Sequence, residues 1–194
     1  MSARRTTLSR RTRETGIELE LNLDGSGRLD IRTGLGFWDH MLTALAFHAG
    51  WDLSLQCDGD LDVDDHHTVE DCALAVGQAV REAVGDEPVA RFGDARIPMD
   101  EALAEAAVDY SGRPCAVIEL GLERPAIGAV ATENLEHALQ SLATAAAFTL
   151  HVAVPRGRND HHRAEAAFKA VGRSLRQALA PVAGEIRSTK GEVR

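Results

Sequence analysis

Six of the eight histidines in this chain fall into two matched groups, each with a glutamate. In each group a His-His pair is followed by glutamate three residues later, and another histidine lies on an earlier segment. The eight residues are His40, His66, His67, Glu70, His137, His161, His162 and Glu165. Imidazole and carboxylate groups are ligands for divalent first-row metal ions. The pattern therefore predicts metal binding.

Helical geometry limits how one His-His-x-x-Glu segment can bind metal. Neighbouring helical side chains project about 100° apart, so His66 and His67 cannot easily face one ion, whereas Glu70 lies on the same side as both. We therefore expect each pair to serve two ions, with both groups contributing to both. Four protein ligands per ion would leave a six-coordinate ion such as Mn²⁺ with two open positions for substrate or water, although zinc, iron and cobalt remain open.

A single His-His-x-x-Glu segment is most often just a solvated helix start, but two copies at matched offsets favour a metal site. The other histidines are His48 and His151, and His151 falls inside a predicted strand, where a structural role is expected.

The repeat extends beyond the metal motif. Asp39-His40-Met-Leu42 matches Glu136-His137-Ala-Leu139, and Ala75-Val76-Gly77 matches Ala170-Val171-Gly172. The chain is therefore expected to be a duplicated α/β (α+β) protein, each half a small sheet with two helices. The expected boundaries are a variable basic segment at 1–13, a first repeat at 14–98 and a second repeat at 99–194, the two halves forming one compact domain.

Hydrophobic periodicity and turn residues place the elements. Residues 15–23 and 29–31 alternate around a turn at 24–27, which predicts a β-hairpin. Further strands are expected at 51–55 and 148–154, extended chain at 108–120 and a loop at 91–98. Helices are expected after residue 40 and at 67–84, 134–147 and 161–179.

Charge and composition narrow the partners. The net charge of −9 argues against nucleic acid or an anionic membrane as the main partner. No segment approaches the roughly 20 apolar residues of a membrane span, and no apolar stretch follows the N-terminal arginines. Three cysteines without C-x-x-C spacing indicate neither a disulfide framework nor a thiolate zinc site, so a cytoplasmic location is expected. Lys169 and Lys190 are the only lysines, which indicates either that a compact ammonium is needed at these two positions or that the genome favours arginine.

Several longer motifs resemble those of the imidazoleglycerol-phosphate dehydratase family, from about Arg13 to the end of the chain. They are Gly36-Phe-Trp-Asp-His40-Met-Leu, Asp64-Asp-His-His-Thr-Val-Glu-Asp71, Met99-Asp-Glu-Ala-Leu103, Asp109-Tyr-Ser-Gly-Arg-Pro114, Gly157-Arg-Asn-Asp-His-His162 and Ser188-Thr-Lys-Gly191. The resemblance implies dehydration of D-erythro-imidazole glycerol phosphate to imidazole acetol phosphate in histidine biosynthesis. It also implies two Mn²⁺ per active site, helices packed between two four-stranded mixed β-sheets, and a homo-oligomer. The oligomer that the resemblance implies is a 24-subunit shell of trimers with active sites where subunits meet.

The resemblance also assigns roles to residues. The eight histidines and glutamates named above match the family's metal ligands, with His40, His66 and His161 also expected near the substrate and Glu70 and Glu165 in catalysis. The remaining positions that match substrate contacts are Glu14, His48, Arg91, Arg113, Lys169, Ser188, Thr189 and Lys190. Among these, Glu14, His48 and Lys169 are also expected to be catalytic. The chain departs from the family at Trp38, where leucine is frequent, and at 126–132, which lacks the usual Phe-Asp.

Differences between the two halves indicate which residues meet an asymmetric substrate. Lys169 corresponds to Leu74, and His48 to Ala145. We hypothesise that the substrate imidazole binds the di-manganese centre as an imidazolate, which helps to expel the neighbouring hydroxyl. Glu14, or a metal-bound water, would then take the proton from the next carbon, giving an enol that becomes the ketone.

For the phosphate, Arg91, Arg113, Ser188 and Lys190 offer charge-assisted hydrogen bonds. Alone, each of these residues could equally belong to the solvated surface.

Two other functions fit paired metal ions. A two-metal hydrolase or phosphatase would also need open metal positions, although such sites usually contain more carboxylates than imidazoles. A non-enzymatic metal cage would not need Lys169 or the Ser188-Thr-Lys190 segment. Ketone formation from imidazole glycerol phosphate, with and without Mn²⁺, separates the three.

Overall fold

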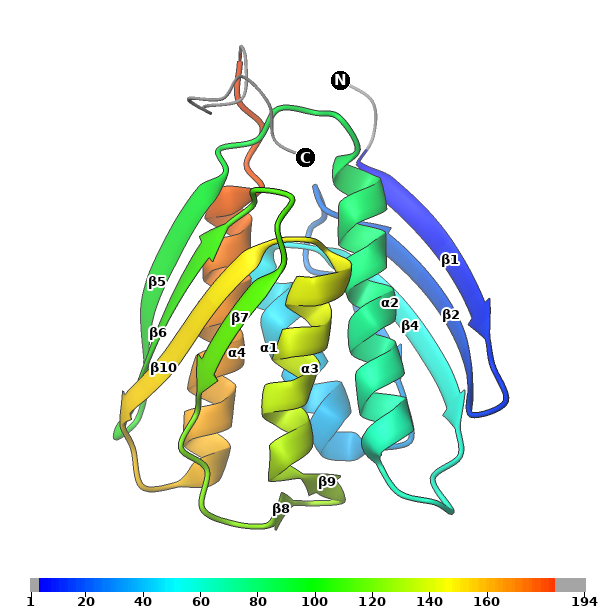
Figure 1. Cartoon of the computed structure of the whole chain (residues 1–194), viewed down its shortest axis with the longest axis vertical. Coiled ribbons are helices and arrows are strands. Elements are labelled where there is room, and N and C mark those ends of the chain that lie inside the picture. Colours follow the sequence, from blue (N-terminus) through cyan, green and yellow to red (C-terminus); the bar gives the residue numbers. More distant parts are fainter. Residues whose placement is uncertain (1–3, 184–194) are drawn as a thin grey trace.

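Four helices lie between two four-stranded sheets in the computed structural model, which describes residues 4–183 (Figure 1). This arrangement confirms the expected fold class. The expected substrate-binding residues Ser188, Thr189 and Lys190 lie outside the described residues.

The two sheets have the same plan. The first contains β1 (Arg5–Arg11), β2 (Thr15–Asn22), β3 (Leu29–Arg32) and β4 (Asp52–Gly59) in the order β1-β2-β4-β3. The second contains β5 (Phe92–Met99), β6 (Ala102–Asp109), β7 (Cys115–Glu119) and β10 (Thr149–Arg156) in the order β5-β6-β10-β7. In both sheets the first two pairings are antiparallel and the last is parallel. The short β8 (Ala126–Ile127) and β9 (Val130–Ala131) pair with each other.

The helices are α1 (Gly36–Ala49), α2 (His66–Val84), α3 (Thr132–Ala145) and α4 (Asp160–Ala178), and all four begin at the lower end of Figure 1. Helix α1 packs on α4, and α2 packs on α3. Each pair therefore joins one helix from each half of the sequence, which brings together ligands that are far apart along the chain.

Glycine allows each helix pair to approach closely. A Cβ atom at Gly77 of α2 would lie 2.6 Å from the Leu142 carbonyl oxygen of α3, and one at Gly172 of α4 would lie 2.3 Å from the Leu45 carbonyl oxygen of α1. Real Cβ atoms do not come this near to backbone oxygen. The two matched glycines are thus required by backbone contact between the helices.

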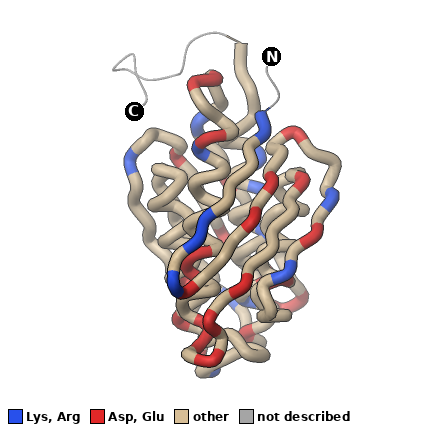
Figure 2. The backbone as a smooth tube through the Cα atoms, turned by 90° about the vertical axis from the view of Figure 1, so that its right-hand side faces the viewer, with Lys and Arg blue, Asp and Glu red and all other residues tan. Residues whose placement is uncertain are grey.

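Alternation along the strands turns one face of each sheet toward the helices. In β2, Ile17, Leu19 and Leu21 are buried, while Glu18 and Glu20 between them are exposed. Burial of such side chains contributes roughly 1.5–3 kcal/mol each. Acidic and basic residues are interspersed along the backbone on the side of the molecule seen in Figure 2.

The expected β-hairpin at 15–31 is wrong. Strand β4 pairs with both β2 and β3 and so separates them. The Asp52 carboxylate, at the start of β4, accepts hydrogen bonds from the backbone N–H groups of Ser26 and Arg28 and so stabilises the wide turn. Turn residues indicate that the chain reverses, but they do not show whether another strand fills the gap.

The expected loop at 91–98 is also wrong, because β5 occupies most of it. Its turn-forming residues are tolerated in an edge strand, and Gly93 is buried because α4 lies directly over it; a Cβ there would be 2.1 Å from the Ser174 carbonyl oxygen. Strand β1, at the edge of the first sheet, likewise lies within the basic segment 1–13.

Across residues 4–183, none of the helices has the length and apolar character needed to cross a bilayer.

Candidate metal centres

The first group of candidate ligands, here called the α1/α4 cluster, comprises His40, His161 and Glu165. Their ligand atoms all lie within 4.8 Å of one another. The Nε2 atoms of His40 and His161 are each 3.3 Å from Glu165 Oε2. The Glu165 side chain is only 10% exposed, whereas the His40 imidazole is 42% exposed. One carboxylate oxygen thus faces both imidazoles at the edge of the core.

The second group, the α2/α3 cluster, comprises His66, Glu70 and His137, again with ligand atoms within 4.8 Å. Here the two carboxylate oxygens divide the contacts: Glu70 Oε2 is 3.4 Å from His66 Nε2, and Oε1 is 3.0 Å from His137 Nε2. The two imidazole rings stack, with centroids 5.1 Å apart.

The α2/α3 cluster passes a direct test of fit for a cation. His137 Nε2 is buried and makes no hydrogen bond, although Glu70 Oε1 lies 3.0 Å away. A buried polar atom without a partner costs free energy. A divalent cation between the imidazoles and the carboxylate would satisfy this nitrogen, and nitrogen and oxygen donors suit a first-row metal ion.

The second histidine of each pair points away from its cluster. The ring centroids of His66 and His67 are 5.9 Å apart with planes at 78°, and those of His161 and His162 are 6.2 Å apart at 84°. The divergence expected from helical geometry is therefore present. His67 and His162 belong to neither three-residue cluster.

Carboxylates hold the rings of these outward histidines. His67 Nδ1 lies 3.0 Å from Asp60, and His162 Nδ1 lies 2.7 Å from Glu101. These hydrogen bonds raise the pKa of both histidines. The His162 ring and the backbone N–H groups of Asn159 and Arg158 lower the pKa of Glu101 to about 2. In each case Nε2 points away from the cluster. His67 Nε2 lies 3.7 Å from Glu14, and His162 Nε2 lies 3.7 Å from Asp100.

Asp60 and Glu101 were not predicted as partners of the histidines. Asp64 and Asp65, which directly precede the His66-His67 pair, instead accept hydrogen bonds from the backbone N–H groups of His66 and Ala131. They hold the start of α2 and the start of α3 rather than the rings. Nothing in the spacing identifies Asp60, and the only signal for Glu101 was its place in the Met99-Asp-Glu motif.

Lys169 and His48 lie along the α1/α4 pair. Lys169 Nζ is 2.6 Å from Glu165 Oε1. Burial raises the pKa of Glu165, but the hydrogen bonds from Lys169 and His40 outweigh it, so the pKa is lowered overall. Burial also lowers the pKa of His48, with smaller contributions from the charges of Lys169 and Arg173.

The two expected arginines are at the other end of the molecule. The backbone N–H of Arg91 donates to the carbonyl of Ala178 at the end of α4, and the Arg91 guanidinium pairs with Asp109 at 2.7 Å. Ala178 is 17 residues beyond His161, which corresponds to about 25 Å along a helix. The carbonyl of Arg113 accepts from Thr149, just beyond α3. Within one chain, these arginines and the metal clusters are thus separated by much of a helix length.

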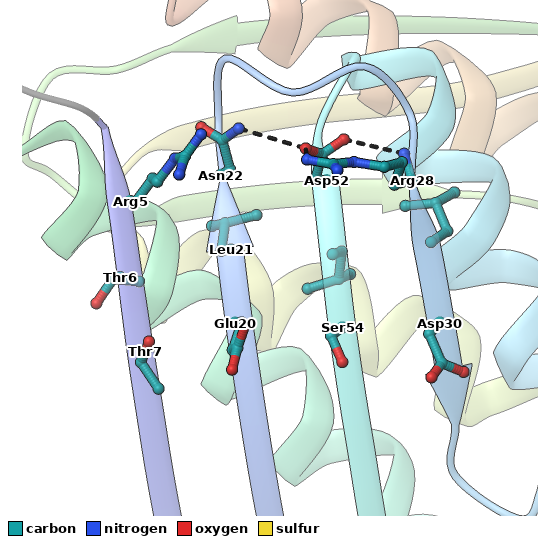
Figure 3. Close-up of a pocket in the computed structure, with 12 residues that line it drawn as sticks. Arg5, Thr6, Thr7, Glu20, Leu21, Asn22, Arg28, Asp30, Asp52 and Ser54 are labelled. Atoms are coloured by element: carbon teal, nitrogen blue, oxygen red, sulfur yellow. Dashed lines mark hydrogen bonds and ion pairs between the residues drawn. The ribbon is translucent and has the colours of Figure 1, made fainter.

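The hollow in Figure 3 lies elsewhere, on the outer face of the first sheet, with a volume of about 370 Å³. At the end of the hollow where β4 begins, the Asp52 carboxylate accepts hydrogen bonds from Arg28 at 2.9 Å and Asn22 at 3.4 Å (Figure 3). None of the expected site residues lines it. This hollow is therefore a polar depression in a sheet surface, distinct from the metal clusters.

A sequence model of the family described as imidazoleglycerol-phosphate dehydratase matches residues 33–175. The chain belongs to the imidazoleglycerol-phosphate dehydratase family. Relatives of that name from Methanothermobacter thermautotrophicus and Candida glabrata are 50% and 49% identical; the alignments cover 100% of both chains in the first case, and 95% of this chain and 97% of the relative in the second. The chain is thus a hydro-lyase of histidine biosynthesis.

Solved structures of imidazoleglycerol-phosphate dehydratase agree. The Staphylococcus aureus structure matches with a TM-score of 0.83 at 35% identity, over 92% of this chain and 99% of that one. The Pyrococcus furiosus structure matches with a TM-score of 0.84 at 36% identity, over 95% of this chain and 99% of that one. The fold and the family resemblance expected from the motifs are confirmed.

Proposed function

We propose that this chain dehydrates D-erythro-imidazole glycerol phosphate to imidazole acetol phosphate in the cytoplasm, using two Mn²⁺ ions per active site. The observation that carries the proposal is the pair of three-residue clusters, each with two imidazoles and one carboxylate within 4.8 Å. The buried His137 Nε2, which makes no hydrogen bond, supports cation binding at one of them.

His67 and His162 are proposed as the fourth ligands, each donated to a cluster of a neighbouring copy. Both are named as ligands by the family motif, yet within one chain both point away from the clusters. Their Nδ1 atoms are held by carboxylates, which leaves Nε2 available as a donor. Such exchange would require a homo-oligomer, for which we propose trimers that assemble into a 24-subunit shell.

The same geometry supports an active site shared between copies. Glu14 lies 3.7 Å from His67 Nε2, so it would accompany that histidine into the neighbouring copy. Arg91 and Arg113 would likewise meet the substrate phosphate from another copy, together with Ser188, Thr189 and Lys190. A single chain holds the arginines about 25 Å along a helix from the metal ligands.

In the reaction, a hydroxyl leaves the carbon beside the imidazole ring, and a proton leaves the next carbon. The bound cations would act as Lewis acids toward the substrate. Glu14 accepts the carbon-bound proton as the hydroxyl leaves, so that water is lost and an enol forms. The enol then tautomerises to the ketone. Lys169 carries its ammonium beside Glu165, where it donates hydrogen bonds to the polar part of the substrate; His48 lies farther along the same helix pair and supports the phosphate end.

The decisive experiment measures ketone formation from imidazole glycerol phosphate by the full-length protein, with Mn²⁺ and after chelation. Ketone that depends on Mn²⁺ supports the dehydratase. Release of inorganic phosphate would point instead to a two-metal phosphatase, and metal uptake with neither product to a cage. Native mass in the presence and absence of Mn²⁺ tests the proposed assembly.

Glu14→Gln tests the proposed base, with Glu18→Gln on the exposed face of β2 as the control. Glu14→Gln should retain Mn²⁺ and lose turnover, while the control should retain both. Full turnover in Glu14→Gln would remove Glu14 from the mechanism.

We further propose that the two halves arose by duplication. The matched strand order and orientation of the two sheets, and the matched close contacts at Gly77 and Gly172, support this origin.

A further inference from the structure

The two clusters differ at one position that the repeat places in register. Aligning Asp39-His40 with Glu136-His137 sets Phe37 of α1 opposite Asn134 of α3. Both residues lie in the first turns of their helices and contact a cluster histidine donated by the partner helix. Asn134 carries an amide and Phe37 a hydrocarbon ring. The two clusters therefore have a histidine held by a different kind of contact, a hydrogen bond in one and ring packing in the other.

Asn134 makes a hydrogen bond across the α2/α3 helix pair. Its Oδ1 atom lies 2.9 Å from His66 Nδ1, and Asn134 is only 5% exposed. An imidazole that binds a cation through Nε2 carries its proton on Nδ1, and that proton then has Oδ1 as its acceptor. The amide therefore favours the tautomer and ring orientation in which the lone pair of His66 Nε2 can bind a cation beside Glu70.

Phe37 offers no such acceptor. Its ring packs edge-on against His161, with centroids 5.1 Å apart and planes at 62°. Among residues 4–183 no hydrogen-bond partner of His161 Nδ1 is present. On its Nδ1 side the His161 ring is thus positioned by packing against Phe37, which leaves its tautomer less constrained than that of His66.

The carboxylates reinforce the difference. Glu165 already has an ammonium 2.6 Å away in Lys169, and that positive charge opposes a cation at the α1/α4 cluster. Glu70 has ion-pair contacts only with His66 and His137 within the described chain. Its negative charge is therefore more fully available to a bound cation.

We propose that Asn134 is a positioning residue that makes the α2/α3 cluster the tighter of the two cation sites, so that this cluster binds Mn²⁺ first. The inference rests on the proposed metal function of the clusters. Partners that orient ligand histidines typically change metal affinity by about 10–100-fold when they are removed.

The test is a Mn²⁺ titration of the cation-free, full-length protein, in which the electron paramagnetic resonance signal of the free ion is measured at each step. The wild type should bind one equivalent per chain at least about tenfold more tightly than the second. Asn134→Leu, which keeps the bulk but removes the acceptor, should weaken the tight equivalent by about 10–100-fold. Asn134→Asp, which restores an acceptor, should recover it.

Phe37→Leu is the matched control, because it alters the same position of the repeat in the other cluster and should leave the tight equivalent unchanged. Glu70→Gln assigns the tight equivalent to its cluster by abolishing it. Two equivalents of equal affinity in the wild type, or an unchanged tight equivalent in Asn134→Leu, would overturn the inference. Absence of any Mn²⁺ binding by the wild type would instead refute the metal centre of the proposed function.

Discussion

The α1/α4 and α2/α3 clusters contain the same residue types on matched helices, yet their surroundings differ. The Glu165 side chain is 10% exposed, shares one oxygen between two histidines and is paired with Lys169. The Glu70 side chain is 33% exposed and divides its oxygens between two histidines. The comparison teaches that a repeat can preserve a set of candidate ligands while the neighbouring residues give each cluster a different charge and exposure.

The largest expected effect comes from removing one carboxylate at a time. Glu70→Gln and Glu165→Gln should each lose one Mn²⁺ equivalent per chain and reduce ketone formation by more than the roughly hundredfold seen for indirect partners, because a direct ligand is lost. Metal analysis and the ketone assay measure both. If either variant lost both equivalents, the clusters would not be independent and the comparison would fail.

The close helix contacts give the next effect. Gly172→Ala and Gly77→Ala should each lower the free energy of unfolding by about 1–3 kcal/mol through overpacking, Gly172→Ala more, because its added Cβ would meet backbone oxygen at 2.3 Å rather than 2.6 Å. Urea unfolding measures the loss. Gly36→Ala is the control, since a Cβ there meets nothing within 4 Å. Equal stability of Gly172→Ala and wild type would contradict the described packing.

A pair of mirror substitutions sharpens the role of Lys169. Lys169→Met should strengthen Mn²⁺ binding at the α1/α4 cluster by roughly tenfold, since a nearby like charge is removed, while it reduces turnover. Leu74→Lys places an ammonium one turn beyond Glu70 and should weaken the α2/α3 cluster. Mn²⁺ titration and the ketone assay follow both. Unchanged binding in both variants would show that this charge does not distinguish the clusters.

The smallest expected effect is a pH dependence at the far end of α1, where His48 matches Ala145. Burial, with the charges of Lys169 and Arg173, lowers the pKa of folded His48, while Glu165 acts in the opposite direction. The unfolded chain therefore takes up this proton at higher pH, and the cation-free protein should lose stability as pH falls through the ordinary histidine pKa near 6.5. His48→Gln should reduce the difference between unfolding at pH 7.5 and pH 5.5. An identical difference in wild type and variant would exclude His48 as its source.

Much of the fold and the candidate site could be predicted because the signals are local. The alternation in β2 and the one-sided apolar pattern of α2 follow from the geometry of single elements. Edge strands such as β5 were missed, because their residues resemble a loop until α4 covers them. Asp60, Glu101 and Asn134 were missed because they reach their histidines from other elements.

The sequence by itself determined the identities of the eight candidate ligands, the divergence of each His-His pair and the duplicated pattern of strands and helices. Only the tertiary structure decided that each cluster joins helices from both halves, and that Arg91 lies at the opposite end of α4 from His161. The reason is physical: residue chemistry and helical period act over a few neighbouring residues, whereas the pairing of helices depends on how faces distant in the chain pack together.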